Sequence, residues 1–183
     1  MKDDSKKAFN AEGTRDFLIW SSEKEIAIHE AAHTVAEISE GRKPDHVTII
    51  PSQTYSGYMM HGGVRLRPGI KTKRTIISHI FVSMVGPIAQ NRVSGKFDSD
   101  IEAFENSKTD TDSVKDTLNN IVENRYVSKD ELMRKAYRKA DRFLNKQENM
   151  DLIYALAHVL RDHQTLNKDE IIRWVHFFKS KMD

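Results

Sequence analysis

The chain has 183 residues, of which 38% are hydrophobic and 31% are charged, and its formal net charge is +2. This composition fits one globular domain, and the small net charge indicates neither a nucleic-acid surface nor a membrane-binding patch. Because the sequence contains no cysteine, disulfides, thiolate zinc sites and a cysteine nucleophile are excluded. Any metal ion must therefore be held by His, Asp or Glu.

The first residues, MKDDSKKAFNAEGTRD, are charged and lack the apolar core of a secretory signal. We expect residues 1–14 to be a flexible lead-in and residues 15–183 to form a single domain. The longest apolar stretch, TIISHIFVSMVGPIA, is shorter than the roughly 20 residues that span a bilayer. A cytoplasmic protein without membrane association is the expectation.

The segment SSEKEIAIHEAAHTVAEISEG predicts a helix over residues 23–40. Ser22 followed by Glu25 has the form of a capping box at its start. Gly41 stands where a left-handed cap is expected at its end.

After residue 41, two segments have strand character and most of the remaining chain has helical patterns. HVTII at 46–50 and SGYMMHGGVRLR at 56–67 have strand character, and apolar residues recur at helical spacing within 71–95. The polar segment 96–112 predicts a loop. Together these patterns predict a mainly α protein with a small β-sheet, an α+β fold class. Further helices are predicted over residues 113–126, 129–146, 149–163 and 168–181.

Residues 29–33, HEAAH, are the motif that points to chemistry. Helix positions four apart lie on one face, so His29 and His33 can present two imidazole nitrogens to one zinc ion. Glu30 can then activate a zinc-bound water as general base. The alternative is a chance pattern, but two imidazoles on an otherwise apolar helix would still need polar partners.

A catalytic zinc needs a third protein ligand, and HEAAH does not supply it. Residues 36 and 39 are Ala and Ser, so the pattern HExxHxxGxxH is absent. We expect the other central histidines to be structural or solvent-facing, with a hydrogen bond to a ligand histidine as the alternative. These histidines are His46, His61 and His79, and the open candidates for the third ligand are Asp98, Asp100, Glu102, Glu105, Asp110 and Asp112.

Four segments, in order along the chain, resemble the peptidase domain of the FtsH family of ATP-dependent zinc proteases. They are SSEKEIAIHEAAH, DHVTIIPSQTYSGYMM, VGPIAQNRVSG and DLIYALAHVLRDHQTLNKDEI. The resemblance implies a mostly helical, zincin-like fold and a third ligand that is an aspartate opening a helix after a small polar stretch. In TDTDSVKDTL it implies Asp112 as that ligand, with Asp110 as the alternative.

The chain also departs from the family pattern. HEAGH is replaced by HEAAH, and the Ala-Glu-Glu stretch is Ala89-Gln90-Asn91; these changes concern substrate preference and the surroundings of the ligands. No GxxxxGK[ST] occurs. We therefore expect an ATP-independent zinc metalloendopeptidase that hydrolyses unfolded or flexible polypeptides.

Substrate binding is expected at a sheet edge, where an extended polypeptide adds as a strand. Residues 56–61, with Tyr58 and Met59, are the candidate edge, and an ordinary half-buried strand is the alternative. Two other functions stay open: a catalytically silent module that binds peptides or partner proteins, and a zincin of another lineage with Glu102 or Glu105 as third ligand. No nucleic acid or ATP is expected as a partner, and assembly into a homo-oligomer stays open.

Overall fold

The computed structural model describes residues 12–53, 59–60, 63–64, 73–119 and 128–182. Helices make up most of this part, and each strand has only two or three residues, so the predicted fold class is confirmed at the level of mainly α with small sheets. In chain order the elements are α1 (Glu12–Ser39), β1 (His46–Thr48), β2 (Ser52–Gln53), β3 (Met59–Met60), β4 (Gly63–Val64), α2 (Lys73–Ser94), α3 (Asp100–Asn106), α4 (Lys108–Asn119), α5 (Lys129–Leu144), α6 (Gln147–His163), β5 (Thr165–Asn167) and α7 (Lys168–Met182).

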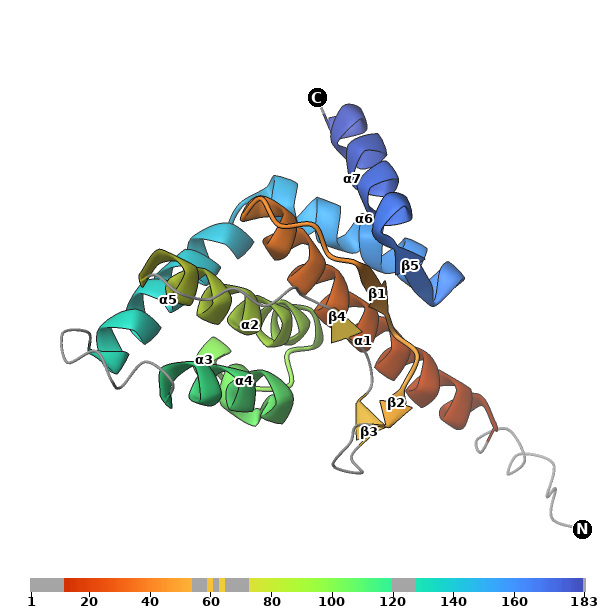
Figure 1. Ribbon diagram of the computed structural model, residues 1–183. Helices are drawn as coiled ribbons and strands as arrows, with labels where there is room; N and C mark the ends of the chain where they lie inside the picture. Colours follow the sequence, from red (N-terminus) through yellow and green to blue (C-terminus); the bar gives the residue numbers. More distant parts are fainter. Residues whose placement is uncertain (1–11, 54–58, 61–62, 65–72, 120–127, 183) are drawn as a thin grey trace, which may run out of the picture.

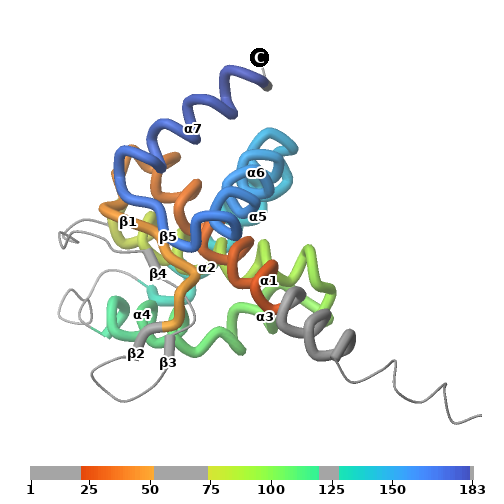
Figure 2. The backbone as a smooth tube through the Cα atoms, turned by 90° about the vertical axis from the view of Figure 1, so that its right-hand side faces the viewer, coloured from red at the N-terminus to blue at the C-terminus, as the bar shows by residue number. Residues whose placement is uncertain are grey.

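Helix α1 runs through the middle of the molecule and packs against both α2 and α6, while α5 packs against α2 (Figure 1). Ala27, Ala31 and Ala36 on α1 are fully buried, and their small side chains let the neighbouring helices approach closely. The pair α3–α4 and the C-terminal helix α7 lie at opposite ends of the molecule in both views (Figure 1, Figure 2). Within the described ranges, no helix has the combined length and apolar character of a membrane span.

A three-stranded antiparallel sheet, in the order β4-β1-β5, lies beside α1. Val47 of β1 pairs with Val64 on one side and with Leu166 on the other. Val47 and Leu166 are fully buried, so the sheet is fixed to the core by its central positions. Strands β2 and β3 form a separate antiparallel pair.

The helix predicted over 23–40 is present, but α1 begins at Glu12, so the Ser22–Glu25 pair does not mark its start. Its end is confirmed: Gly41 has a φ of 74°. The amide of Gly41 donates to the carbonyl of Ile38, and the next amide donates to that of Glu37, which is a Schellman cap. Most of the predicted lead-in lies outside the described residues.

Apart from α4, which begins at Lys108 instead of residue 113, the other helices and the first strand lie close to their predicted positions. The segment 71–95 forms α2, and the last four predicted helices correspond to α4 through α7. The predicted strand 46–50 is β1, whereas the strand predicted over 56–67 contributes β3 and β4 in its described part. Strands β2 and β5 were not predicted.

The loop predicted over residues 96–112 is wrong, because this segment contains α3 and the beginning of α4. Ser99 caps α3 by accepting the amide hydrogen of Glu102. Ala103 and Phe104 are buried. A polar segment can therefore be helical here because one side-chain cap and two buried side chains hold it.

Candidate metal centre

Glu25, His29, His33 and Glu37 recur every fourth residue on α1. The first three have hydrogen-bond partners on α2, and Glu37 pairs with Arg42 just after the end of α1. A spacing of four keeps side chains along one face of a helix. Most of the residues between them, including Ala31 and Ala32, are buried and apolar. The sequence thus carries a polar stripe into the interior, where each group needs a partner.

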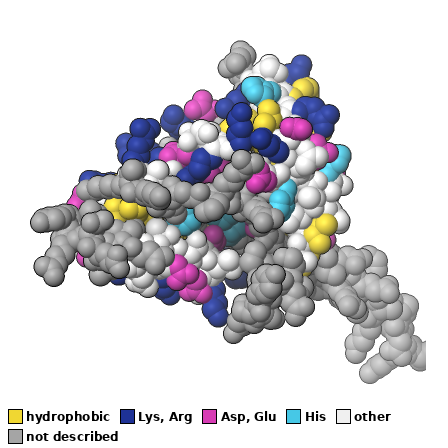
Figure 3. Space-filling view, viewed as in Figure 1, with side chains coloured by type: hydrophobic (Ala, Val, Ile, Leu, Met, Phe, Trp, Pro, Cys, Tyr) yellow, Lys and Arg dark blue, Asp and Glu magenta, His cyan; other side chains and the backbone are white. Residues whose placement is uncertain are grey.

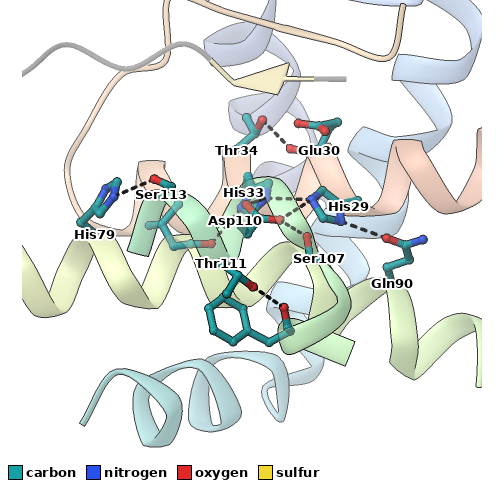
Figure 4. Close-up of polar contacts among 12 residues, drawn as sticks. His29, Glu30, His33, Thr34, His79, Gln90, Ser107, Asp110, Thr111 and Ser113 are labelled. Atoms are coloured by element: carbon teal, nitrogen blue, oxygen red, sulfur yellow. Dashed lines mark hydrogen bonds and ion pairs between the residues drawn. The ribbon is translucent and has the colours of Figure 1, made fainter. Parts of the chain in front are cut away.

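Two residues of this stripe meet an aspartate from a distant segment. The Nε2 atoms of His29 and His33 are 3.0 Å apart. Asp110 places Oδ2 at 3.1 Å from His29 Nε2 and Oδ1 at 3.2 Å from His33 Nε2. Figure 4 shows the three side chains pointing toward one another, two from α1 and one from α4.

The cluster is mostly buried but still meets solvent. The exposed fractions of the side chains are 16% for His29, 10% for His33 and 14% for Asp110. In the space-filling view, histidine and acidic side chains are visible together near the middle of the face (Figure 3). The three side chains are therefore not completely closed off from solvent.

The geometry fits a zinc ion. Zinc binds imidazole nitrogen and carboxylate oxygen at about 2.0–2.1 Å in a tetrahedral arrangement, so its ligand atoms lie about 3.3 Å from one another. The two Nε2 atoms are 3.0 Å apart, close to that value, and each has a different oxygen of Asp110 within 3.2 Å. In the described part of the chain, this is the group of His and acidic residues able to hold a metal ion.

The hydrogen bonds made by Nδ1 of each imidazole are also consistent with metal binding through Nε2. His33 Nδ1 donates to the carbonyl of Val82 at 2.8 Å, and His29 Nδ1 donates to Oε1 of Gln90 at 2.9 Å. A neutral imidazole that carries its hydrogen on Nδ1 has a free lone pair on Nε2. Two such lone pairs and a carboxylate around one point repel each other unless a cation or a proton lies between them.

Asp110 lies in the first turn of α4, where the helix dipole favours a carboxylate. Ser107, just before the helix, donates its hydroxyl to Asp110 Oδ2 at 2.5 Å. Burial by itself would raise the pKa of Asp110, but the imidazoles of His33 and His29 outweigh it and hold that pKa far below its usual range. The carboxylate is therefore ionised and held in place.

The structure does not bring Asp112 to the histidines, which corrects the expected placement of that residue; the carboxylate beside both imidazoles is that of Asp110, the alternative. The side chain of Asp112 is 54% exposed, and its carboxylate lies 3.7 Å from Nζ of Lys115. Two residues along a helix correspond to a rotation of about 200°, which puts Asp110 and Asp112 on opposite faces of α4.

The other acidic candidates lie in or beside α3 and take structural roles. Asp100 pairs with Arg92 at 2.7 Å. Glu102 accepts the amide hydrogen of Asp98, and both side chains are exposed, as is that of Glu105. The structure thus places none of these four carboxylates in the cluster.

Glu30 follows the first ligand candidate on α1 and is only 7% exposed. Burial raises the pKa of Glu30, and the imidazoles of His29 and His33 partly oppose that shift. The carboxylate therefore shares the electrostatic environment of the cluster, and its raised pKa makes it a stronger proton acceptor than an exposed glutamate.

The other site predictions are only partly covered by the structure. His79 Nε2 lies 3.1 Å from Oγ of Ser113 and links α2 to α4, while burial lowers the pKa of His79. His46 belongs to β1. Met59 belongs to β3. Tyr58 and His61 lie outside the described residues, so the predicted substrate-binding edge stays a prediction.

Three residues beside the cluster were not predicted as part of it. Gln90 forms a hydrogen bond with His29, Ser107 forms a hydrogen bond with Asp110, and Gly86 lies against His33. Ser107 had a local signal, because a serine three residues before an acidic residue is typical of a helix start. The roles of Gly86 and Gln90 depend on how α2 packs against α1, and no local pattern reveals that.

A comparison with models of known protein families finds no match for this chain, and no curated protein matches it either. The likeness to the FtsH-family peptidase domain rests on the four quoted segments alone. The chemistry of the cluster is therefore the basis on which a function can be proposed.

Proposed function

We propose that this protein is a zinc metalloendopeptidase that hydrolyses unfolded or flexible polypeptides without ATP. The observation that carries the proposal is the convergence of His29, His33 and Asp110 next to a buried glutamate, Glu30. A zinc ion bound there would act as a Lewis acid toward the scissile carbonyl and lower the pKa of a water to about 7.

Each residue has a distinct role in the proposed reaction. His29, His33 and Asp110 would hold the metal and leave a fourth position for water or substrate. Glu30 would accept a proton from the water that attacks the peptide carbonyl. The same carboxyl group would then give that proton to the leaving amine nitrogen, so that Glu30 returns to its starting state.

The small sheet supports an extended substrate. Among the described residues, strand β4 is the outer strand of the sheet β4-β1-β5, and it also contacts α1, which carries both histidines. A polypeptide that adds to such an edge through backbone hydrogen bonds must be extended. Unfolded or flexible chains meet this requirement, whereas compact folded proteins expose few free strands.

The variant Glu30→Gln tests the proposal. It should retain zinc in a one-to-one ratio, measured by elemental analysis, and lose cleavage of casein by about 100-fold or more, because it lacks the general base. Glu23→Gln is the matched control, since Glu23 is an exposed glutamate on the same helix. Full activity of Glu30→Gln would refute the mechanism. Stoichiometric zinc without cleavage by the unmodified protein would instead favour the silent binding module.

A further inference from the structure

Gln90 of α2 bridges two residues of α1 that lie one turn apart. Its Oε1 is 2.9 Å from His29 Nδ1, and its Nε2 donates to Oε2 of Glu25 at 3.2 Å. A carboxylate can only accept hydrogen bonds, so Glu25 turns the NH₂ end of the amide toward itself. The oxygen end then faces His29 and accepts the hydrogen on Nδ1, which leaves the lone pair of Nε2 directed at the cluster.

The two histidines differ in what holds them. His33 donates to the backbone carbonyl of Val82, and no side-chain substitution removes that acceptor. His29 depends on a side chain, Gln90, which depends in turn on Glu25. Two residues outside the HEAAH motif therefore determine the tautomer and orientation of His29.

The neighbour of Gln90 has a different task. Asn91 is buried, donates to the carbonyl of Phe97 and accepts the amide hydrogen of Phe97, and so closes the turn between α2 and α3. Gln90 thus contacts a residue of the cluster, whereas Asn91 stabilises the connection between α2 and α3. This difference supplies a matched control on the same helix.

We propose that Gln90 is a positioning residue for His29 and that Glu25 sets the direction of its amide. The inference rests on the proposed zinc site, because it concerns how one ligand is presented to the metal. The proposed role also requires that one of positions 25 and 90 carries a carboxylate and the other an amide. Two carboxylates 3.2 Å apart would repel each other, and two amides would leave the orientation undetermined.

Gln90→Met keeps the side-chain volume nearly constant and removes the acceptor. We expect its zinc affinity to fall by about 10- to 100-fold, the usual effect of losing the hydrogen-bond partner of a ligand histidine. Cobalt(II) in place of zinc should show an altered visible spectrum, because the orientation of one ligand changes. Asn91→Leu, as the control, should lower the melting temperature and leave the zinc affinity of the folded protein within about threefold of the unmodified value.

An exchange of the two groups gives the sharpest test. Gln90→Glu alone brings two carboxylates together, so that one of them must turn away, and it should weaken zinc binding. The double variant Glu25→Gln/Gln90→Glu restores one amide and one carboxylate, and the new carboxylate at position 90 can accept from both neighbours. We expect it to regain zinc affinity to within about threefold of the unmodified protein, together with its cobalt spectrum. A residue that only fills space would show no such recovery.

The outcomes separate this inference from the proposed function. If the unmodified protein binds neither zinc nor cobalt, the proposed site fails and the positioning role fails with it. If the unmodified protein binds zinc and Gln90→Met binds it equally tightly with the same cobalt spectrum, only the positioning role is refuted. Should Gln90→Met not fold, the exchange decides: equal zinc affinity of Gln90→Glu and the double variant would refute the role.

Discussion

Gly86 lies directly against the imidazole of His33. A β-carbon built on Gly86 would be 2.4 Å from Nε2 and 2.6 Å from Cε1 of that ring, and real β-carbons essentially never come within 3.0 Å of another heavy atom. The ring cannot easily move aside, because its Nδ1 donates a hydrogen bond to the carbonyl of Val82, which lies on α2 like Gly86. Helix α2 therefore fixes His33 from two sides.

Gly86→Ala should weaken metal binding even though alanine is the better helix former. Helix propensity favours alanine by about 1 kcal/mol, but forcing an extra carbon into a packed site costs about 1–3 kcal/mol. We expect a lower melting temperature and at least a tenfold loss of zinc affinity. Thermal unfolding of the metal-free protein and a zinc titration measure the two effects separately.

Gly95→Ala is the control for this substitution. A β-carbon at residue 95 meets nothing within 4 Å, but the φ of 63° is unfavourable for alanine. It should cost about 1 kcal/mol of stability without changing zinc affinity. A Gly86→Ala protein that is more stable and binds zinc normally would show that His33 does not occupy the position described.

The third ligand can be tested with two aspartates two residues apart. Asp110→Asn removes a carboxylate that faces both imidazoles. We expect its zinc affinity to fall by more than about 100-fold, because loss of an outer hydrogen-bond partner alone costs 10- to 100-fold. Asp112→Asn alters an exposed side chain and should bind zinc as the unmodified protein does. Equal losses, or a larger loss for Asp112→Asn, would overturn the choice of Asp110.

This pair of aspartates also shows where sequence reasoning stops. The positions of His29, Glu30 and His33 could be predicted because one helical turn relates them, and that geometry is local. The choice between Asp110 and Asp112 depends on where α4 begins. The sequence pattern predicted a start at residue 113, whereas the helix begins at Lys108, and this shift decides which carboxylate faces inward.

The fold shows the same division between local and distant causes. Repeating apolar positions predicted α2, α5, α6 and α7 with boundaries within a few residues. The polar segment around Ser99 and Ser107 was missed as helix because only a few of its residues, such as Phe104, face the core. The contact of Gln90 with His29 joins positions 61 residues apart, and its existence depends on helix packing that one sequence does not specify.

Glu37, at the end of the polar stripe, is fully buried and pairs with Arg42. Burial raises the pKa of Glu37, and the Arg42 guanidinium partly opposes this shift. Arg42→Met would leave a buried carboxylate without its cation, which should cost about 3–5 kcal/mol of unfolding free energy at pH 7. Urea unfolding measures this change.

A second substitution checks the cause of that loss. Glu37→Gln in the Arg42→Met background removes the unpaired charge and should recover part of the stability. Arg138→Met is the control, because Arg138 is an exposed arginine whose replacement should change stability by less than about 0.5 kcal/mol. If Arg42→Met is as stable as this control, the buried pair is not what stabilises the end of α1.

Zinc affinity should rise with pH over the neutral range. In the metal-free protein, burial by itself would lower the pKa of His33, but the facing carboxylate of Asp110 outweighs burial and raises that pKa to about 9. Below pH 9 the ring therefore carries a proton that zinc must displace. Because one proton is released per ion bound, the apparent affinity should increase about tenfold for each pH unit up to pH 9 and then level off.

The stability of the metal-free protein should change in the opposite direction. A pKa of His33 raised from 6.5 to about 9 means that the folded state binds the proton more tightly than the unfolded chain does. This contribution is complete below pH 6.5 and is lost as the pH rises through 9. Zinc competition with a chelating dye and thermal unfolding in a chelator, each at pH 6.5, 7.5 and 8.5, measure the two trends. His158→Gln, which changes a histidine with 76% of its side chain exposed, should leave both slopes unaltered, and an affinity independent of pH would contradict the protonated pairing of His33 with Asp110.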